Sequence, residues 1–195
     1  MNDLLVEQDD ASTPLTPEEQ EGLIPSYITL RSELNEAEQA NILDAADWAF
    51  NRPRDVLSEK FLSSLHKRMF GQVWKWAGTY RRSGKNIGVD AYRIPVELRQ
   101  LLNDARYWIE NGTFPADEIA TRFHHKLVWI HLFPNGNGRH ARTATDLLLV
   151  KLGHPPFTWG RVSLVDPNET RQSYVDALRA ADHQDYKHLL KFTRS

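Results

Sequence analysis

The sequence predicts an all-α domain, a helical bundle that carries one small β-hairpin. Three observations support this prediction. Apolar residues recur with the helical period over most of the chain. Proline, glycine or a capping residue stands at most of the boundaries between these periodic stretches. Residues 78 to 94 alone are rich in glycine and basic side chains, and short β-favouring stretches flank Ser83-Gly84.

The helices follow from the N-terminus onward. In the run Thr16-Pro17-Glu18-Glu19, threonine is a cap, proline the first helical residue and Glu19 the closing member of a capping box. We expect residues 1–35 to form an N-terminal extension around this short helix, and residues 36–195 to form the main domain with its C-terminal helices. Further helices are expected after the caps Asn35 and Asp55, from Pro95 to Glu110, over 116–130, from Arg139 to Leu152, and over 167–181 and 184–192.

Composition excludes several classes of function. The 195 residues suffice for one domain with a substantial core. A net charge of -2 indicates no broad basic surface for nucleic acid, and no apolar run is long enough to cross a bilayer. Without cysteine, disulfides and thiolate catalysis are excluded. Because the first residues do not form a secretory signal, we expect a cytoplasmic protein with neither nucleic acid nor membrane as a partner.

Residues 131–142, His-Leu-Phe-Pro-Asn-Gly-Asn-Gly-Arg-His-Ala-Arg, contain the clearest chemical signal. The turn Gly136-Asn137-Gly138 can expose successive backbone N–H groups, and a helix start behind it adds partial positive charge. Arg139 and Arg142 stand three apart on that helix, and arginine binds phosphate oxygens through a rigid fork of donors. His131 precedes the turn and can move a proton near neutral pH. The segment therefore predicts a polyphosphate cradle with a general base at its edge.

Three other histidines have structural interpretations. His124 and His125 precede the motif on a helix, without the spacing of a metal-binding pair, and we expect one to face the core and one a neighbour. His140 is expected to face outward or to cap a contact.

The motif resembles that of the Fic family, H-x-F-x-[D/E]-G-N-G-R-x-x-R, and matches it at every fixed position but one. The segment Trp76 to Arg81 is similar to the one that leads into the flap of Fic domains. The resemblance covers residues 36 to 193. The run Glu21 to Pro25, together with Asn135, is also similar to a small bacterial subgroup called mobile mystery protein B.

Fic proteins mostly transfer AMP from ATP to a hydroxyl side chain of a target protein. The resemblance therefore implies a Fic-like helical bundle, a protein adenylyltransferase activity, ATP as donor and a target with a Ser, Thr or Tyr hydroxyl. It also implies a role for each motif residue: His131 takes the proton from the hydroxyl, Gly136, Asn137 and Gly138 hold the α- and β-phosphates, Arg139 neutralises phosphate charge, and Arg142 reaches the γ-phosphate. A target-docking flap is implied at Tyr80, Arg82, Lys85, Asn86, Ile87 and Gly88.

Asn135 is the one departure from the motif, since the family usually has Asp or Glu there to hold Mg²⁺. An asparagine offers Mg²⁺ only a neutral carbonyl oxygen, so we expect a weak site that forms with nucleotide. The departure leaves two alternatives open. One is a transferase on the same fold with another phosphate-containing donor. The other is a non-catalytic nucleotide- or partner-binding module of a toxin–antitoxin pair, with an antitoxin or a second copy of the chain as partner.

Many Fic proteins are silenced by a helix with the pattern [S/T]-x-x-x-E-[G/N], whose glutamate pairs with the second arginine of the motif. Glu21-Gly22 resembles the end of this pattern, although Thr16 stands one position too early. The hypothesis is that Glu21 pairs with Arg142 and obstructs the γ-phosphate.

Overall fold

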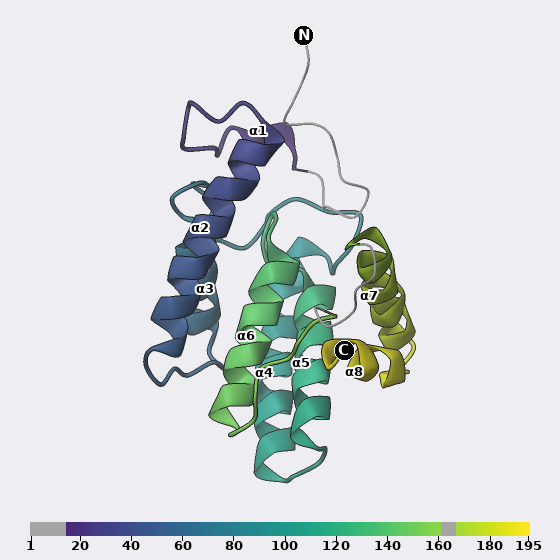
Figure 1. The fold of residues 1–195 in the computed structure, drawn as a ribbon. Coiled ribbons are helices and arrows are strands. Elements are labelled where there is room, and N and C mark those ends of the chain that lie inside the picture. Colours follow the sequence, from purple (N-terminus) through teal and green to yellow (C-terminus); the bar gives the residue numbers. More distant parts are fainter. Residues whose placement is uncertain (1–14, 161–166) are drawn as a thin grey trace.

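The computed structural model describes residues 15–160 and 167–195. Its centre is formed by α4, α5 and α6, with α2 and α3 against one side and α7 and α8 against the other (Figure 1). The all-α prediction is confirmed. The helices are α1 (Pro17–Gln20), α2 (Arg31–Phe50), α3 (Glu59–Phe70), the 3₁₀-helix η1 (Ala91–Arg93), α4 (Ile94–Glu110), α5 (Ala116–Ile130), α6 (Asn137–Lys151), α7 (Pro167–Asp182) and α8 (Lys187–Thr193).

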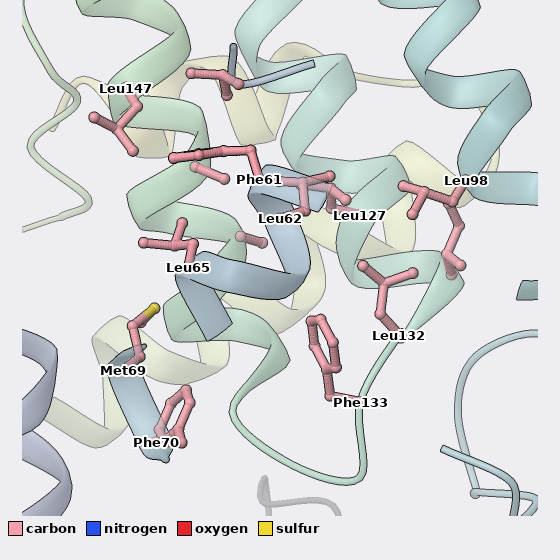
Figure 2. Packing of buried hydrophobic residues seen from close by; sticks show 14 of the residues in the cluster. Phe61, Leu62, Leu65, Met69, Phe70, Leu98, Leu127, Leu132, Phe133 and Leu147 are labelled. Carbon is pink, nitrogen blue, oxygen red and sulfur yellow. The ribbon is translucent and has the colours of Figure 1, made fainter. Parts of the chain in front are cut away.

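Helix α6 lies at the centre because its small and apolar side chains are buried against the neighbouring helices. Ala141, Ala144 and Leu148 of this helix are fully buried, and small residues on its surface let neighbouring helices approach closely. Figure 2 shows side chains of α3, α5 and α6 meeting in this core, with Leu132 and Phe133 of the motif at its edge. A second apolar cluster joins the far end of α6 to α7 and α8. No helix in the described ranges combines the length and apolar character that a membrane span requires.

The predicted start of α1 is confirmed, but those of α2 and α3 differ in the structure. The capping box of α1 is present, because the Thr16 hydroxyl accepts from Glu19 and the Glu19 carboxylate accepts from the Thr16 N–H. Helix α2 begins at Arg31 rather than after Asn35, since Glu33 accepts the N–H groups of both residues that precede the helix. The predicted boundary between residues 35 and 36 therefore falls inside α2. Helix α3 begins after Ser58 instead of Asp55.

The predicted β-hairpin is wrong, because described residues 80–90 contain no strand. The Arg81 side chain donates to the carbonyls of Ser83 and Val89, which lie on either side of the tip of this segment. Those carbonyls are thus bound by a guanidinium instead of a cross-strand ladder. A single two-stranded hairpin is marginal in water, so this contact decides the conformation. We keep the name flap for residues 80–92.

Candidate active site

The candidate base, His131, lies where α5 ends. It is the C-terminal cap of this helix and adopts a left-handed backbone conformation, with φ 58°. Only 4 % of its surface is exposed. Burial, together with the smaller effect of the positive charges of Arg81 and Lys85, lowers the pKa of His131 to about 4, although a hydrogen bond to the Val128 backbone opposes the shift. The imidazole is therefore neutral at pH 7, as a proton acceptor must be.

The predicted cradle is built at the start of α6. Gly136 is the N-cap, with φ 78°, and a Cβ on this residue would lie 2.6 Å from the buried ring of Phe70. Glycine is therefore required here on two grounds, backbone conformation and space. The first N–H groups of a helix have no partner within the helix and bind anions. In α6 these belong to Asn137, Gly138 and Arg139, since the helical bonds begin with His140 N–H to Gly136.

The Asn137 side chain supports the loop that precedes α6. It is buried, and its amide faces the loop instead of the cradle. Its oxygen accepts from the Phe133 N–H at 2.9 Å, and its nitrogen donates to the Phe133 carbonyl at 2.7 Å. Asn137 thus fixes the loop through its side chain and has its backbone N–H left for an anion.

The sequence reasoning missed His66, which supports the same loop from α3. Gly78 N–H donates to its Nδ1 at 2.9 Å, so the hydrogen lies on Nε2, which donates to the Asn135 carbonyl at 3.0 Å. The ring stacks on Phe133, with centroids 3.7 Å apart. Burial holds the pKa of His66 well below its ordinary value. A histidine among the apolar positions of α3 was the available signal, because a buried polar group needs a partner.

The side chain of Asn135 does not form a metal site by itself. Its Oδ1 accepts from the Gly136 N–H at 2.6 Å. No cluster of three or more acidic, histidine or cysteine side chains is found in the part of the chain that the structure describes. Mg²⁺ prefers several charged or water oxygens in a regular octahedron. The donor set on the protein therefore does not fit a resident magnesium ion.

The two motif arginines turn toward different neighbours. Arg139 pairs with Glu38 of α2, Nη1 to Oε2 at 2.7 Å, and lies over the Phe70 ring. Glu38 is buried and also accepts from Trp74 Nε1 at 2.6 Å. The arginine that was expected to neutralise phosphate charge is thus already paired with a buried carboxylate. The sequence analysis did not single out Glu38, although it is a charged residue at one of the buried positions of α2.

Arg142 instead lies against α7. Its guanidinium carbon is 4.6 Å from the centre of the Tyr174 ring and 5.8 Å from that of Trp159. The Tyr174 hydroxyl, which also contacts His124 Nε2 at 2.8 Å, is hydrogen-bonded to this arginine. Glu21, the residue expected to pair with Arg142, is exposed at the end of α1. Among the described residues the two form no ion pair, and the regulatory role of Glu21 stays a prediction.

Glu19 is the acidic residue of α1 that reaches the flap. Ser83 Oγ donates to Glu19 Oε1 at 2.7 Å, and the Lys85 ammonium pairs with Oε2. These donors hold the pKa of Glu19 below its ordinary value although burial opposes them. The Trp76 indole donates to the Glu19 carbonyl at 2.9 Å. Helix α1 is thereby fastened to the flap and to the segment before it.

The expected flap residues divide into two groups. Tyr80 is half-buried and packs against Phe133, and the Lys85 side chain is 2 % exposed in its pair with Glu19, so a docking role for these two residues stays a prediction. The other four are exposed, and among them Gly88 lies against His131: Arg82, Asn86, Ile87 and Gly88.

The three structural histidines are all buried. His125 contacts Asp182 at 2.9 Å, and His124 contacts Tyr174. His140 donates to the Leu62 carbonyl at 3.0 Å, so the expectation that it caps a contact is confirmed and the outward alternative is wrong. Burial lowers the pKa of His124 to about 3 and that of His140 to about 4.

Comparison with known families agrees with this geometry. The model of the Fic/DOC family matches residues 56–149, which include the whole motif. The chain belongs to the Fic/DOC family. A protein adenylyltransferase Fic from Aedes aegypti is 30 % identical over 158 residues, which are 77 % of this chain and 30 % of that protein. The relative of the same name from Drosophila melanogaster is 29 % identical over 137 residues, 68 % of this chain and 26 % of the relative. The chain thus spans less than a third of these relatives.

Solved structures show the Fic fold as well. The N-terminal Fic domain of Bep8 from Bartonella sp. 1-1C has a TM-score of 0.69 at 16 % identity, with 87 % of this chain and 88 % of that chain covered. A Fic domain from Bartonella quintana with bound ADP has a TM-score of 0.68 at 17 % identity, with 87 % and 86 % covered. The mobile mystery protein B subgroup stays a prediction.

Proposed function

We propose that this chain is a protein adenylyltransferase, which transfers AMP from ATP to a hydroxyl side chain of a target protein. The observation that carries the proposal is the neutral His131 at the end of α5, followed within five residues by the N-terminus of α6. A proton acceptor and an anion cradle are thus held by one short, buried loop. The adenylyltransferase relatives and the ADP-bound Fic neighbour support a nucleotide as the ligand.

The reaction follows from these positions. The target hydroxyl oxygen attacks the α-phosphorus of ATP, its proton passes to His131, and the bond between the α- and β-phosphates breaks to release pyrophosphate. The backbone N–H groups of Asn137, Gly138 and Arg139 would bind the phosphates at the helix N-terminus. Gly88 lies directly on the His131 side chain, so the hydroxyl approaches along the flap. The mechanism contains no step through a protein-bound metal.

The decisive experiment uses ATP labelled at the α-phosphate, a cell lysate as the source of targets, and the purified chain. Wild type should label a protein band, His131→Ala should label none, and both should bind ATP with the same affinity, because His131 lies outside the cradle. Arg139→Ala should lose ATP binding. Equal labelling by wild type and His131→Ala would contradict the assignment of the base.

The side chain of Asn135 favours one alternative, a transferase that uses a phosphate-containing donor other than ATP. Asn135 supplies a neutral oxygen where a carboxylate would help to hold Mg²⁺ on ATP. A screen of phosphate-containing donors with the same lysate separates the two activities. ATP binding without transfer from any donor, even in Asn135→Asp, would identify a binding module, with an antitoxin or a second copy as its partner.

The regulatory hypothesis for Glu21 has its own test. Glu21→Gly should raise auto-modification above wild type if this residue restrains the site. No gain would argue against the hypothesis, and Glu19, which makes the observed contacts with the flap, would be the next residue to replace.

A further inference from the structure

Arg81 connects several backbone segments around the candidate base. Its residue surface is 3 % exposed, and its guanidinium donates to four backbone carbonyls. Two belong to the end of α5: His131, from Nε at 2.6 Å, and Ile130, from Nη2 at 3.4 Å. The other two are Ser83, from Nη1 at 2.9 Å, and Val89, from Nη2.

These four carbonyls share one property: none of them accepts a hydrogen bond within a helix or a sheet. Ile130 and His131 are at a helix C-terminus, where the last carbonyls have no partner within the helix. Ser83 and Val89 bracket the five residues at the tip of the flap. The planar guanidinium carries donors in fixed directions, so it sets the distance between these two pairs of carbonyls.

Two more contacts join the flap to His131 at this point. The Arg81 N–H donates to the Leu132 carbonyl at 3.0 Å, so the backbone on both sides of the base is linked to the same residue. Gly88 has φ 94°, and a Cβ there would lie 2.6 Å from the His131 Cβ and 2.8 Å from Arg81 Nη2. The flap is thus in contact with the histidine and has no room to move toward it.

We propose that Arg81 is a positioning residue that holds the base and the target-docking flap in one fixed relation, so that a hydroxyl docked on the flap meets His131 correctly placed. This inference rests on the proposed function. It differs from a purely structural role, because the guanidinium acts on the residue that accepts the proton. Arg81 binds the backbone carbonyl of His131 itself, in addition to the carbonyls of the flap.

The charge of Arg81 gives the proposal a measurable signature. The charged groups that lower the pKa of His131 are Arg81 and Lys85, both on the flap segment, and Lys85 is itself paired with Glu19 of α1. Removing the Arg81 charge should therefore raise the pKa of His131. Removing a positive charge at a more distant position on the flap should have little effect on the pKa of His131.

The test compares Arg81→Gln and Arg81→Lys with Arg82→Gln, a matched control that removes one positive charge from an exposed site on the same flap. NMR titration of the His131 ring, without substrate, should show a midpoint about 1 pH unit higher in Arg81→Gln. The midpoint should change little in Arg81→Lys and in Arg82→Gln. Hydrogen exchange at residues 83–89 should accelerate in both Arg81 variants and not in the control.

Kinetics provide the second readout. ATP affinity should stay within twofold of wild type in the Arg81 variants, because Arg81 contacts no residue of the cradle, while kcat for AMP transfer should fall about 100-fold. A wild-type His131 midpoint retained in folded Arg81→Gln, or flap exchange unchanged in it, would overturn the proposal. If the wild-type chain transfers no AMP, the proposed function fails by itself, and the titration and exchange still decide the role of Arg81.

Discussion

Acid should destabilise this fold at a pH where carboxylates are still ionised. His124, His131 and His140 are buried, and the structure lowers their pKa values from 6.5 to about 3, about 4 and about 4. Between pH 6.5 and about pH 4 the unfolded chain binds a proton at each of these residues and the folded chain does not. Stability is therefore complete above pH 6.5 and falls as the pH is lowered.

The size of the effect follows from linkage. Each histidine costs about 1.4 kcal/mol of unfolding free energy for each pH unit below 6.5. At pH 5.0 the cost is about 2 kcal/mol per histidine, or about 6 kcal/mol for the three. Domains are commonly stable by about 5–15 kcal/mol. His66, whose pKa is also held low by burial, adds to the loss. We expect the chain to lose most of its stability by pH 5.0.

Urea unfolding followed by tryptophan fluorescence at pH 7.5, 6.5, 5.5 and 5.0 measures this slope. His140→Gln keeps a hydrogen-bond donor but does not titrate, so the slope between pH 6 and pH 5 should decrease by about 1.4 kcal/mol per pH unit. A free energy of unfolding that is constant from pH 7.5 to pH 5.0 would refute the reasoning.

Two substitutions, each with a control variant, test the proposed cradle. Gly136→Ala should lower the unfolding free energy by about 3 kcal/mol, because alanine must adopt a positive φ and push its Cβ into a buried phenyl ring. Gly153→Ala has the same sign of φ with open space around it and should cost only about 1 kcal/mol, so equal losses in thermal denaturation would contradict the steric argument. Glu38→Gln should bind ATP about tenfold more tightly by calorimetry, because Arg139 then loses a competing carboxylate. The control Glu36→Gln removes an exposed charge from the same helix, and a similar gain there would assign the effect to net charge alone.

Local signals in the sequence predicted the parts of the fold that local physics determines. The capping box at Thr16 and the proline at position 95 place α1 and α4 where the structure has them. The start of α2 was missed because its cap is supplied from inside the helix, by Glu33, and not by a polar residue before it. The conformation of the flap was missed because one side chain takes the carbonyls that a hairpin would pair.

The motif identified the candidate site, but not the residues that support it. Arg81, His66 and Glu38 reach the motif from 50, 69 and 101 positions away in the chain. Contacts at such separations leave no periodic pattern around either partner. For His66 and Glu38 the local signal was a polar residue at a buried helical position, which shows that a partner exists without naming it.

The paired hydrogen bonds between Asn137 and the Phe133 backbone have a kinetic consequence. They hold the bend proposed to bind phosphate in shape through bonds within the protein, so no loop would have to be ordered when a nucleotide binds there. Association should then depend on diffusion and charge, with a rate that falls as ionic strength rises, and should show no slow second phase in stopped-flow traces.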